Sequence, residues 1–127
     1  MSKEQIQTDD APAAIGPYSQ AIRSGNMVFV SGQVPINPKT SKIESQDVGE
    51  QTHQVMKNLH NVLAKAGVTF DHVVKTGIFL QDLNDFNIVN EIYGSYLNKP
   101  YPARATVQVA RLPLDVKVEI DVVAVDS

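Results

Sequence analysis

The most constraining feature of this sequence is its last predicted strand, residues 116–125. Polar and apolar residues alternate along its first part, so Glu119 and Asp121 fall on one face and aliphatic residues fall on the other. Its end, residues 122–125, is apolar at both alternating sets of positions. A strand whose two faces are both apolar is usually buried on both sides. The chain must therefore cover two faces of the sheet that contains this strand.

Two helical patterns are available to cover that sheet. Apolar residues recur at spacings of three, four and seven between residues 48 and 66, after a plausible N-cap at Asp47 and before a glycine stop at Gly67. A second apolar stripe runs over residues 86–97. Two helices can cover one face of a sheet, which leaves the other face bare. The bare face favours contact with another copy of the chain; the alternative is a central strand that is fully covered within a monomer.

The remaining segments predict strands that are separated by turns. These strands are expected at residues 18–23, 27–34, 73–80 and 103–110. The order β-β-α-β-α-β-β is an α+β pattern. We expect a mostly antiparallel sheet with two helices on one face, in a single domain of residues 1–127 that begins with a loose N-terminal arm at residues 1–12.

Composition excludes several classes of function. The chain has 11 basic and 14 acidic residues, a net charge of −3, which argues against nucleic-acid binding because that binding depends on Lys and Arg. It has no cysteine, so disulfides, thiolate nucleophiles and Cys-ligated metals are excluded. His53 and His60 lie two helical turns apart and cannot share a metal alone. We therefore expect neither a metal nor a cofactor.

The sequence contains no segment typical of export or of membrane insertion. The N-terminus is polar and lacks the apolar stretch of a secretory signal. The apolar runs, such as residues 27–30, are far shorter than the ~20 residues that span a bilayer. We expect a cytoplasmic protein without a membrane segment.

Two charged residues are candidates for chemistry. Arg104 shares a strand face with Thr106 and Gln108, and its planar guanidinium can bind a carboxylate through two hydrogen bonds. The alternative is an exposed arginine on a solvated strand face. Glu119 lies where a polar stripe meets an apolar region, so its pKa can be raised by burial or lowered by a nearby arginine. The alternative is again a solvated face.

Two further segments are unusual for their setting. Ser31-Gly32 interrupts a predicted strand, which indicates either a β-bulge or a close approach of another group to the backbone. Tyr18 follows Gly16-Pro17 and places a phenol near a bend of the chain. It is either a packed aromatic residue or a ligand contact.

Several short motifs occur in a fixed order from about residue 11 to the C-terminus. They are Gly16-Pro17-Tyr18-Ser19-Gln20-Ala21, Ser31-Gly32-Gln33, Asp82-Leu83 with Phe86 and Asn90, Pro102-Ala103-Arg104, and Leu112-Pro113 before Glu119. In this combination the sequence resembles the RidA (YjgF/YER-type) family of reactive intermediate deaminases.

The resemblance implies a chorismate-mutase-like α+β fold and a homotrimer with ligand clefts between its subunits. It also implies a cofactor-free hydrolase that acts on reactive 2-imino acids and their enamine tautomers, such as 2-iminobutanoate and 2-iminopropanoate. The products would be 2-keto acids and ammonia. Such an activity would limit metabolite damage in amino-acid metabolism.

The resemblance also assigns roles to individual residues. Arg104 would grip the substrate carboxylate, and Glu119 would hold or activate the attacking water. The cleft would be lined by Tyr18, Ser31, the backbone of Gly32, and Asn90. Thr106 stands where some members have a cysteine, and we keep it as a binding contact because it still offers a hydroxyl and a backbone N–H.

Two other functions are considered beside deamination. Family members are also described as L-PSP endoribonucleases and translation inhibitors, but the basic residues here are scattered from Lys3 to Lys117 without interleaved aromatic residues. The other possibility is a non-catalytic regulatory trimer that binds a small carboxylate in the same cleft. Arg104 would serve either role, so only turnover separates the regulator from the enzyme.

Overall fold

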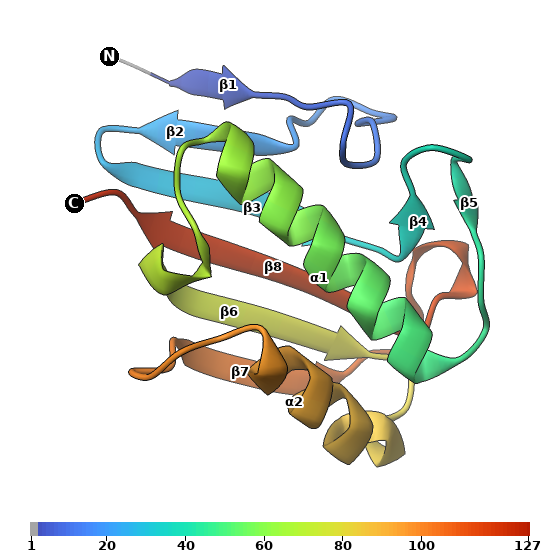
Figure 1. Cartoon of the computed structure of the whole chain (residues 1–127). Coiled ribbons are helices and arrows are strands. Elements are labelled where there is room, and N and C mark those ends of the chain that lie inside the picture. Colours follow the sequence, from blue (N-terminus) through green and yellow to red (C-terminus); the bar gives the residue numbers. More distant parts are fainter. Residues whose placement is uncertain (1–2) are drawn as a thin grey trace.

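The computed structural model of the protein describes residues 3–127. A six-stranded sheet forms its centre, with the strand order β1-β2-β3-β8-β6-β7 (Figure 1). The strands are β1 (Glu4–Ile6), β2 (Ala21–Ser24), β3 (Met27–Gln33), β6 (Val73–Leu80), β7 (Ala103–Gln108) and β8 (Val118–Val125). All neighbours are antiparallel except β6 and β7, which are parallel. The predicted α+β class with a mostly antiparallel sheet is confirmed.

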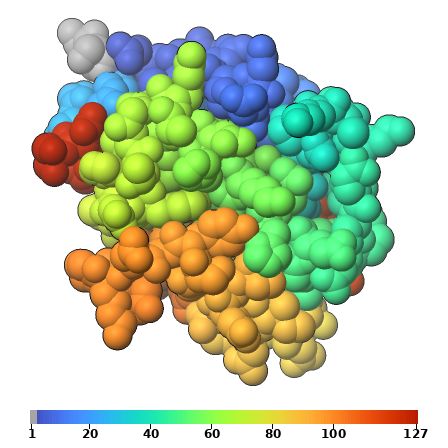
Figure 2. Space-filling model, in the orientation of Figure 1, coloured from blue at the N-terminus to red at the C-terminus, as the bar shows by residue number. Residues whose placement is uncertain are grey.

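Two helices, α1 (Val48–Lys65) and α2 (Phe86–Ser95), lie on the same face of this sheet (Figure 1). Figure 2 shows that they cover most of that face, as predicted. A small hairpin and three 3₁₀ turns complete the fold: β4 (Ile36–Asn37), β5 (Lys42–Ile43), η1 (Phe70–His72), η2 (Leu83–Asp85) and η3 (Pro113–Asp115). Within residues 3–127, no helix combines the length and the apolar character that a membrane crossing requires.

The caps of α1 agree with the sequence pattern. The Asp47 carboxylate accepts a hydrogen bond from the Glu50 backbone N–H at 2.9 Å. Gly67 follows the helix with φ of 83°, a conformation that suits glycine. These two local signals fix where the helix begins and ends, and therefore which of its residues face the sheet.

The core lies between the helices and the sheet. Leu59 and Leu63 of α1 and Leu80 of β6 are fully buried there. Gln51, also buried, ties α1 to the start of β8, because its Oε1 accepts a hydrogen bond from the Lys117 backbone N–H at 2.8 Å. This contact holds the segment that leads directly to Glu119.

The opposite face of the sheet is not covered by any helix of residues 3–127. Val122 and Ala124 of β8 point into the core, whereas Val123 and Val125 point to this open face and are only half-buried. Exposed apolar side chains surround them, including Phe29, which is 43% exposed. The predicted uncovered apolar face is therefore present in the single chain.

The N-terminal segment differs from the prediction of a loose arm over residues 1–12. Residues 4–6 pair with β2, and Ala11 is buried. The buried Gln20 amide holds the segment between them: its Oε1 accepts from the Thr8 N–H at 2.8 Å, and its Nε2 donates to the carbonyls of Thr8, Ala11 and Pro12. The prediction is wrong for the described part, because these contacts join residues far apart in the sequence. Residues 1 and 2 lie outside the described part.

Replacing Gln20 by alanine should loosen the N-terminal segment. Buried backbone groups at Thr8 and Ala11 would lose their partners, so we expect a loss of about 1–3 kcal/mol in the free energy of unfolding. Urea denaturation and amide hydrogen exchange at Thr8 measure this. Gln46→Ala, at an exposed position, is the control and should change neither. Equal stability of both variants would contradict the role of Gln20.

Candidate functional site

Arg104 lies on the helix side of the edge strand β7. Its guanidinium carbon is 5.5 Å from the ring centre of Phe86 and 5.4 Å from that of Tyr93, both on α2. Its Nη1 donates a hydrogen bond to Oδ1 of Asn90 at 2.7 Å. Two aromatic faces and one amide thus fix the plane of the guanidinium, and cation–π attraction favours this arrangement.

Arg104 differs from the two other arginines of the chain. Arg23 pairs with Asp126 at 3.1 Å and Arg111 with Asp115 at 2.8 Å. Arg104 has no carboxylate partner in the described part of the chain, although it is half-buried. It borders a cavity of about 480 Å³ that is also lined by Asn90, Tyr93, Gly94, Tyr101 and Pro102. A guanidinium that is held in place and still has unused N–H donors can bind a planar anion such as a carboxylate.

Thr106 follows two residues later on the same face of β7. Its hydroxyl oxygen is buried, and within residues 3–127 it has no hydrogen-bond partner. A buried polar atom normally has a partner, so an orphaned hydroxyl calls for an explanation. Thr106 does not line the Arg104 cavity, so its role as a binding contact stays a prediction.

Glu119 lies on the open face of β8 and rests against Gly32 of β3. A Cβ at Gly32 would lie 2.9 Å from Cδ of Glu119 and closer still to its Oε2, so only glycine leaves room for this carboxylate. The pairing of β3 with β8 also shifts register between Val30 and Gln33. The two explanations considered for the glycine, a bulge and a close approach, are thus both correct.

The Glu119 carboxylate borders a second cavity, of about 500 Å³. Tyr18, Ser31 and Gly32 line this cavity with it. Tyr18 is 52% exposed, and the Ser31 hydroxyl donates to the Ser19 carbonyl at 2.6 Å. Burial raises the pKa of Glu119, and the nearby negative charge of Asp121 raises it further. This cavity therefore combines a phenol, exposed backbone and a carboxyl with increased proton affinity.

The sheet separates the two groups of predicted residues. Arg104 lies opposite Thr76, and Thr76 opposite the buried Val122, so Arg104 is on the helix side. Glu119 lies opposite Phe79 on the open side. One chain thus brings Asn90, Arg104 and Thr106 together, and separately brings together Tyr18, Ser31, Gly32 and Glu119. It does not bring Arg104 to Glu119.

Comparisons with known proteins place this chain in a family. The family described as Endoribonuclease L-PSP matches residues 8–126. The chain belongs to this family. Its relatives include the Reactive Intermediate Deaminase A, chloroplastic, of Arabidopsis thaliana, which is 51% identical over 98% of this chain and 66% of that protein. The 2-iminobutanoate/2-iminopropanoate deaminase of Escherichia coli K12 is 48% identical over 98% of both chains.

Solved structures of the family confirm the fold. E. coli TdcF with bound serine superposes with a TM-score of 0.94 at 44% identity, covering 98% of this chain and 100% of the other. A putative endoribonuclease from Thermotoga maritima gives a TM-score of 0.96 at 44% identity, covering 99% of each chain. The resemblance to the RidA family is thereby confirmed, and the names within the family include both deaminases and endoribonucleases.

Sequence reasoning missed the aromatic support of Arg104. Tyr93 and Phe86 belong to the apolar stripe of α2, and the pattern indicates only that they pack in the core. In fact both rings also contact the guanidinium, and the Tyr93 hydroxyl donates to Thr76 at 2.9 Å. The available signal was the placement of two aromatic residues on the helix that precedes the Arg104 strand.

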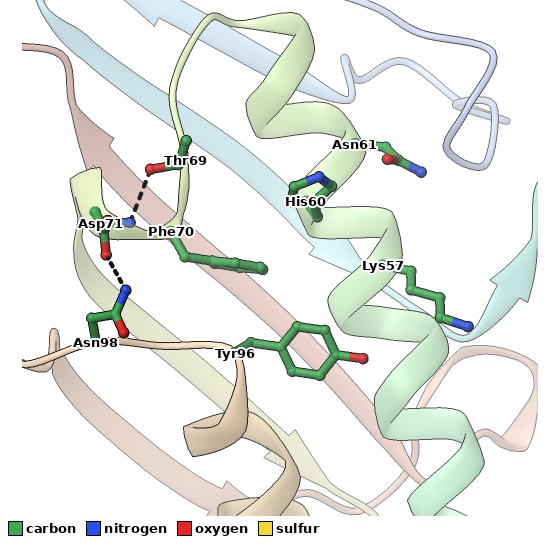
Figure 3. Close-up of a pocket in the computed structure, with 8 residues that line it drawn as sticks. All are labelled: Lys57, His60, Asn61, Thr69, Phe70, Asp71, Tyr96 and Asn98. Carbon is green, nitrogen blue, oxygen red and sulfur yellow. Dashed lines mark hydrogen bonds between the residues drawn. The ribbon is translucent and has the colours of Figure 1, made fainter.

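A further hollow, of about 670 Å³, lies elsewhere and contains none of the predicted residues. Figure 3 shows it between α1, η1 and the end of α2, with the Phe70 and Tyr96 rings pointing toward α1. Several polar groups around it already bond to one another: Asn98 donates to Asp71 at 3.1 Å, and His53 shares a 2.7 Å hydrogen bond with the Tyr96 hydroxyl. The first contact ties the segment after α2 to η1, and the second ties that segment to α1, so both groups have a structural role.

Replacing Gly32 by alanine should displace the Glu119 side chain while leaving the fold intact. The new methyl group would occupy the space of the carboxylate, which would turn toward solvent, so the raised pKa of Glu119 should fall toward its ordinary value. Carboxyl ¹³C NMR titration measures this change. Gly94→Ala, where a Cβ would meet no atom within 4 Å, is the matched control. An unchanged titration of Glu119 in Gly32→Ala would contradict the contact.

Proposed function

We propose that this protein is a homotrimeric, cofactor-free deaminase that hydrolyses 2-imino acids, including 2-iminobutanoate and 2-iminopropanoate, to 2-keto acids and ammonia. The observation that carries the proposal is the free, preorganised guanidinium of Arg104 on one side of the sheet and the half-buried Glu119 on the other. The names of relatives at about 48–51% identity support the same reaction class.

A complete site then requires two subunits. The open sheet face is apolar and bare, with Val107 at 45% and Phe29 at 43% exposure, and a second copy of the chain is the simplest cover. The proposal requires that a neighbour docked on this face sets its Arg104 cavity against the Glu119 cavity of the first subunit. A closed ring of such head-to-tail contacts gives a trimer with one cleft at each interface.

The Arg104 guanidinium would bind the substrate carboxylate through two parallel hydrogen bonds. Thr106 and Asn90 flank it, and Tyr18 and the Gly32 backbone would close the other side of the cleft. The bound serine in the TdcF structure is chemically related, because it too has a nitrogen on the carbon next to a carboxylate. Binding of this kind fixes the imine carbon relative to the attacking water.

Hydrolysis then needs one water molecule and a series of proton transfers. Protonation of an enamine at carbon, or of an imine at nitrogen, gives the iminium ion. Water adds to its C=N carbon as Glu119 accepts one water proton, which gives a neutral tetrahedral carbinolamine. Glu119 then passes this proton to the nitrogen. The C–N bond breaks and ammonia leaves as the C=O bond forms, and the hydroxyl proton returns to Glu119 and from there to solvent. The raised pKa of Glu119 makes it a stronger base than an ordinary carboxylate.

The regulatory alternative uses the same Arg104 clamp but needs no proton transfer. It is distinguished by turnover: a binding protein would retain keto acids without accelerating imine hydrolysis. RNA cleavage, which the description of the family names, would instead require binding of a polyanion by a chain with a net charge of −3.

Arg104→Lys tests the carboxylate clamp. Lysine keeps the charge but cannot form two parallel hydrogen bonds or stack on Phe86 and Tyr93, so we expect kcat/KM for imine hydrolysis to fall about ten- to a hundredfold. Keto-acid formation from the imine measures the rate, and binding of 2-ketobutanoate measures the clamp directly. Arg111→Lys, on the exposed surface, is the control with full activity. Full activity of Arg104→Lys would remove the support for the clamp.

Mixed assemblies test whether Arg104 and Glu119 act from different subunits. Arg104→Ala and Glu119→Gln should each be nearly inactive alone. In assemblies formed from equal amounts of both chains, about a quarter of the clefts join an intact Arg104 to an intact Glu119, so about a quarter of wild-type activity should return.

Light scattering of the wild type and of the mixture provides the structural control for this experiment. The expected mass is three times 13.9 kDa. A monomer at micromolar concentration, or a trimeric mixture that regains no activity, would contradict a site shared between subunits.

A further inference from the structure

Asp121 is a second carboxylate on the open face, two residues beyond Glu119 on β8. It lies directly opposite Gly77 of β6, and a Cβ at Gly77 would lie 2.5 Å from its Oδ1. Glu119 rests in the same way on Gly32 of β3. Because β8 runs between β3 and β6 (Figure 1), each carboxylate occupies a gap left by a glycine of a different neighbouring strand. The backbone thus fixes both acids on one face, each over a different neighbour of β8.

The surroundings of the pair contain few compensating charges. Both carboxylates are half-buried. The positive charge of Lys75 on β6 lowers the pKa of Asp121 and so offsets part of its rise. Lys117 stands two residues before Glu119 in the sequence. Tyr18 and Glu119 line the same cavity, and no residue of β3 carries a charge. Mutual repulsion between the two carboxylates is therefore only partly offset.

We propose that Asp121 is a positioning residue for the hydrolysis proposed above, which acts by keeping Glu119 ready to accept the proton of the attacking water. This inference rests on the proposed function. The Cα atoms of residues two apart on a strand lie ~6.8 Å apart. Two half-buried charges on neighbouring side chains of one face interact more strongly than in water. Asp121 touches neither substrate nor water and works only through Glu119.

The effect of removing Asp121 has a defined sign. Burial and the charge of Asp121 both raise the pKa of Glu119. Asp121→Asn removes the second cause and also leaves the Lys75 ammonium without its acidic neighbour. Both changes favour the ionised form of Glu119, so its pKa should fall. Glu119 becomes a weaker base, and hydrolysis near neutral pH should slow severalfold.

Two readouts on the assembled protein test the proposal. Carboxyl ¹³C NMR titration should show the lower pKa of Glu119 in Asp121→Asn, and the acidic limb of the pH profile of kcat/KM should move down by the same amount. Asp121→Ser repeats the test if the asparagine variant assembles poorly. Asp121→Glu, which keeps the charge, should leave the acidic limb of the kcat/KM pH profile where it lies in the wild type. Asp10→Asn, which removes a charge at an exposed position, should shift neither readout.

The outcomes separate this inference from the proposed function. An unchanged Glu119 titration in both neutral variants overturns the role of Asp121, whatever the activity. A shifted titration with an unmoved acidic limb overturns it too, because Glu119 would then not be the group that limits the rate. If the wild type hydrolyses no imine, the proposed function fails and the catalytic role of Asp121 fails with it. A shifted titration would then describe only a property of the fold.

Discussion

The burial of β8 is the constraint on which the rest of the structure depends. Val118, Ile120 and Ala124 are fully buried against the helices, so the register of this strand is fixed on one side by the core. Strand side chains alternate with a period of two, and a slip of one residue would turn Glu119 and Asp121 into that core. The cost of burying two unpaired carboxylates makes such a slip prohibitive. Hydrophobic packing on one face therefore decides which way the acids point on the other.

The acids in turn reduce the stability of the fold at neutral pH. Burial raises the pKa of both Glu119 and Asp121 above the value of an unfolded chain. A carboxyl of this kind favours the folded state while it is protonated, and that contribution is lost as the pH rises through the folded pKa. Near neutral pH the chain thus keeps two desolvated charges that a stable fold does not need. Perturbed carboxylates retained in this way are typical of functional sites.

Local patterns predicted much of this fold, and long-range contacts account for what they missed. The apolar periodicity placed α1 correctly, and the alternation in β8 placed Glu119 and Asp121 together on the face opposite the aliphatic residues. The sequence did not predict the N-terminal strand, because the strand is stabilised by β2 and by the Gln20 amide. Neither contact leaves a signal in residues 4–6. The sequence also did not predict that Arg104 and Glu119 lie on opposite sides of the sheet. Alternation tells which residues share a face of one strand, but only the register between strands shows that two such faces are opposite.

Under the proposed assembly, Arg104 and Glu119 are each held firmly in place, but they belong to different subunits. Arg104 is fixed by Phe86, Tyr93 and Asn90 within one subunit, and Glu119 by the backbone of β3 within another. Their separation would then be set by how the open face docks. Catalysis of this kind tolerates little misplacement, since rate depends steeply on the geometry of attack. Apolar residues of the open face would thus govern activity as well as assembly, although none of them touches the substrate.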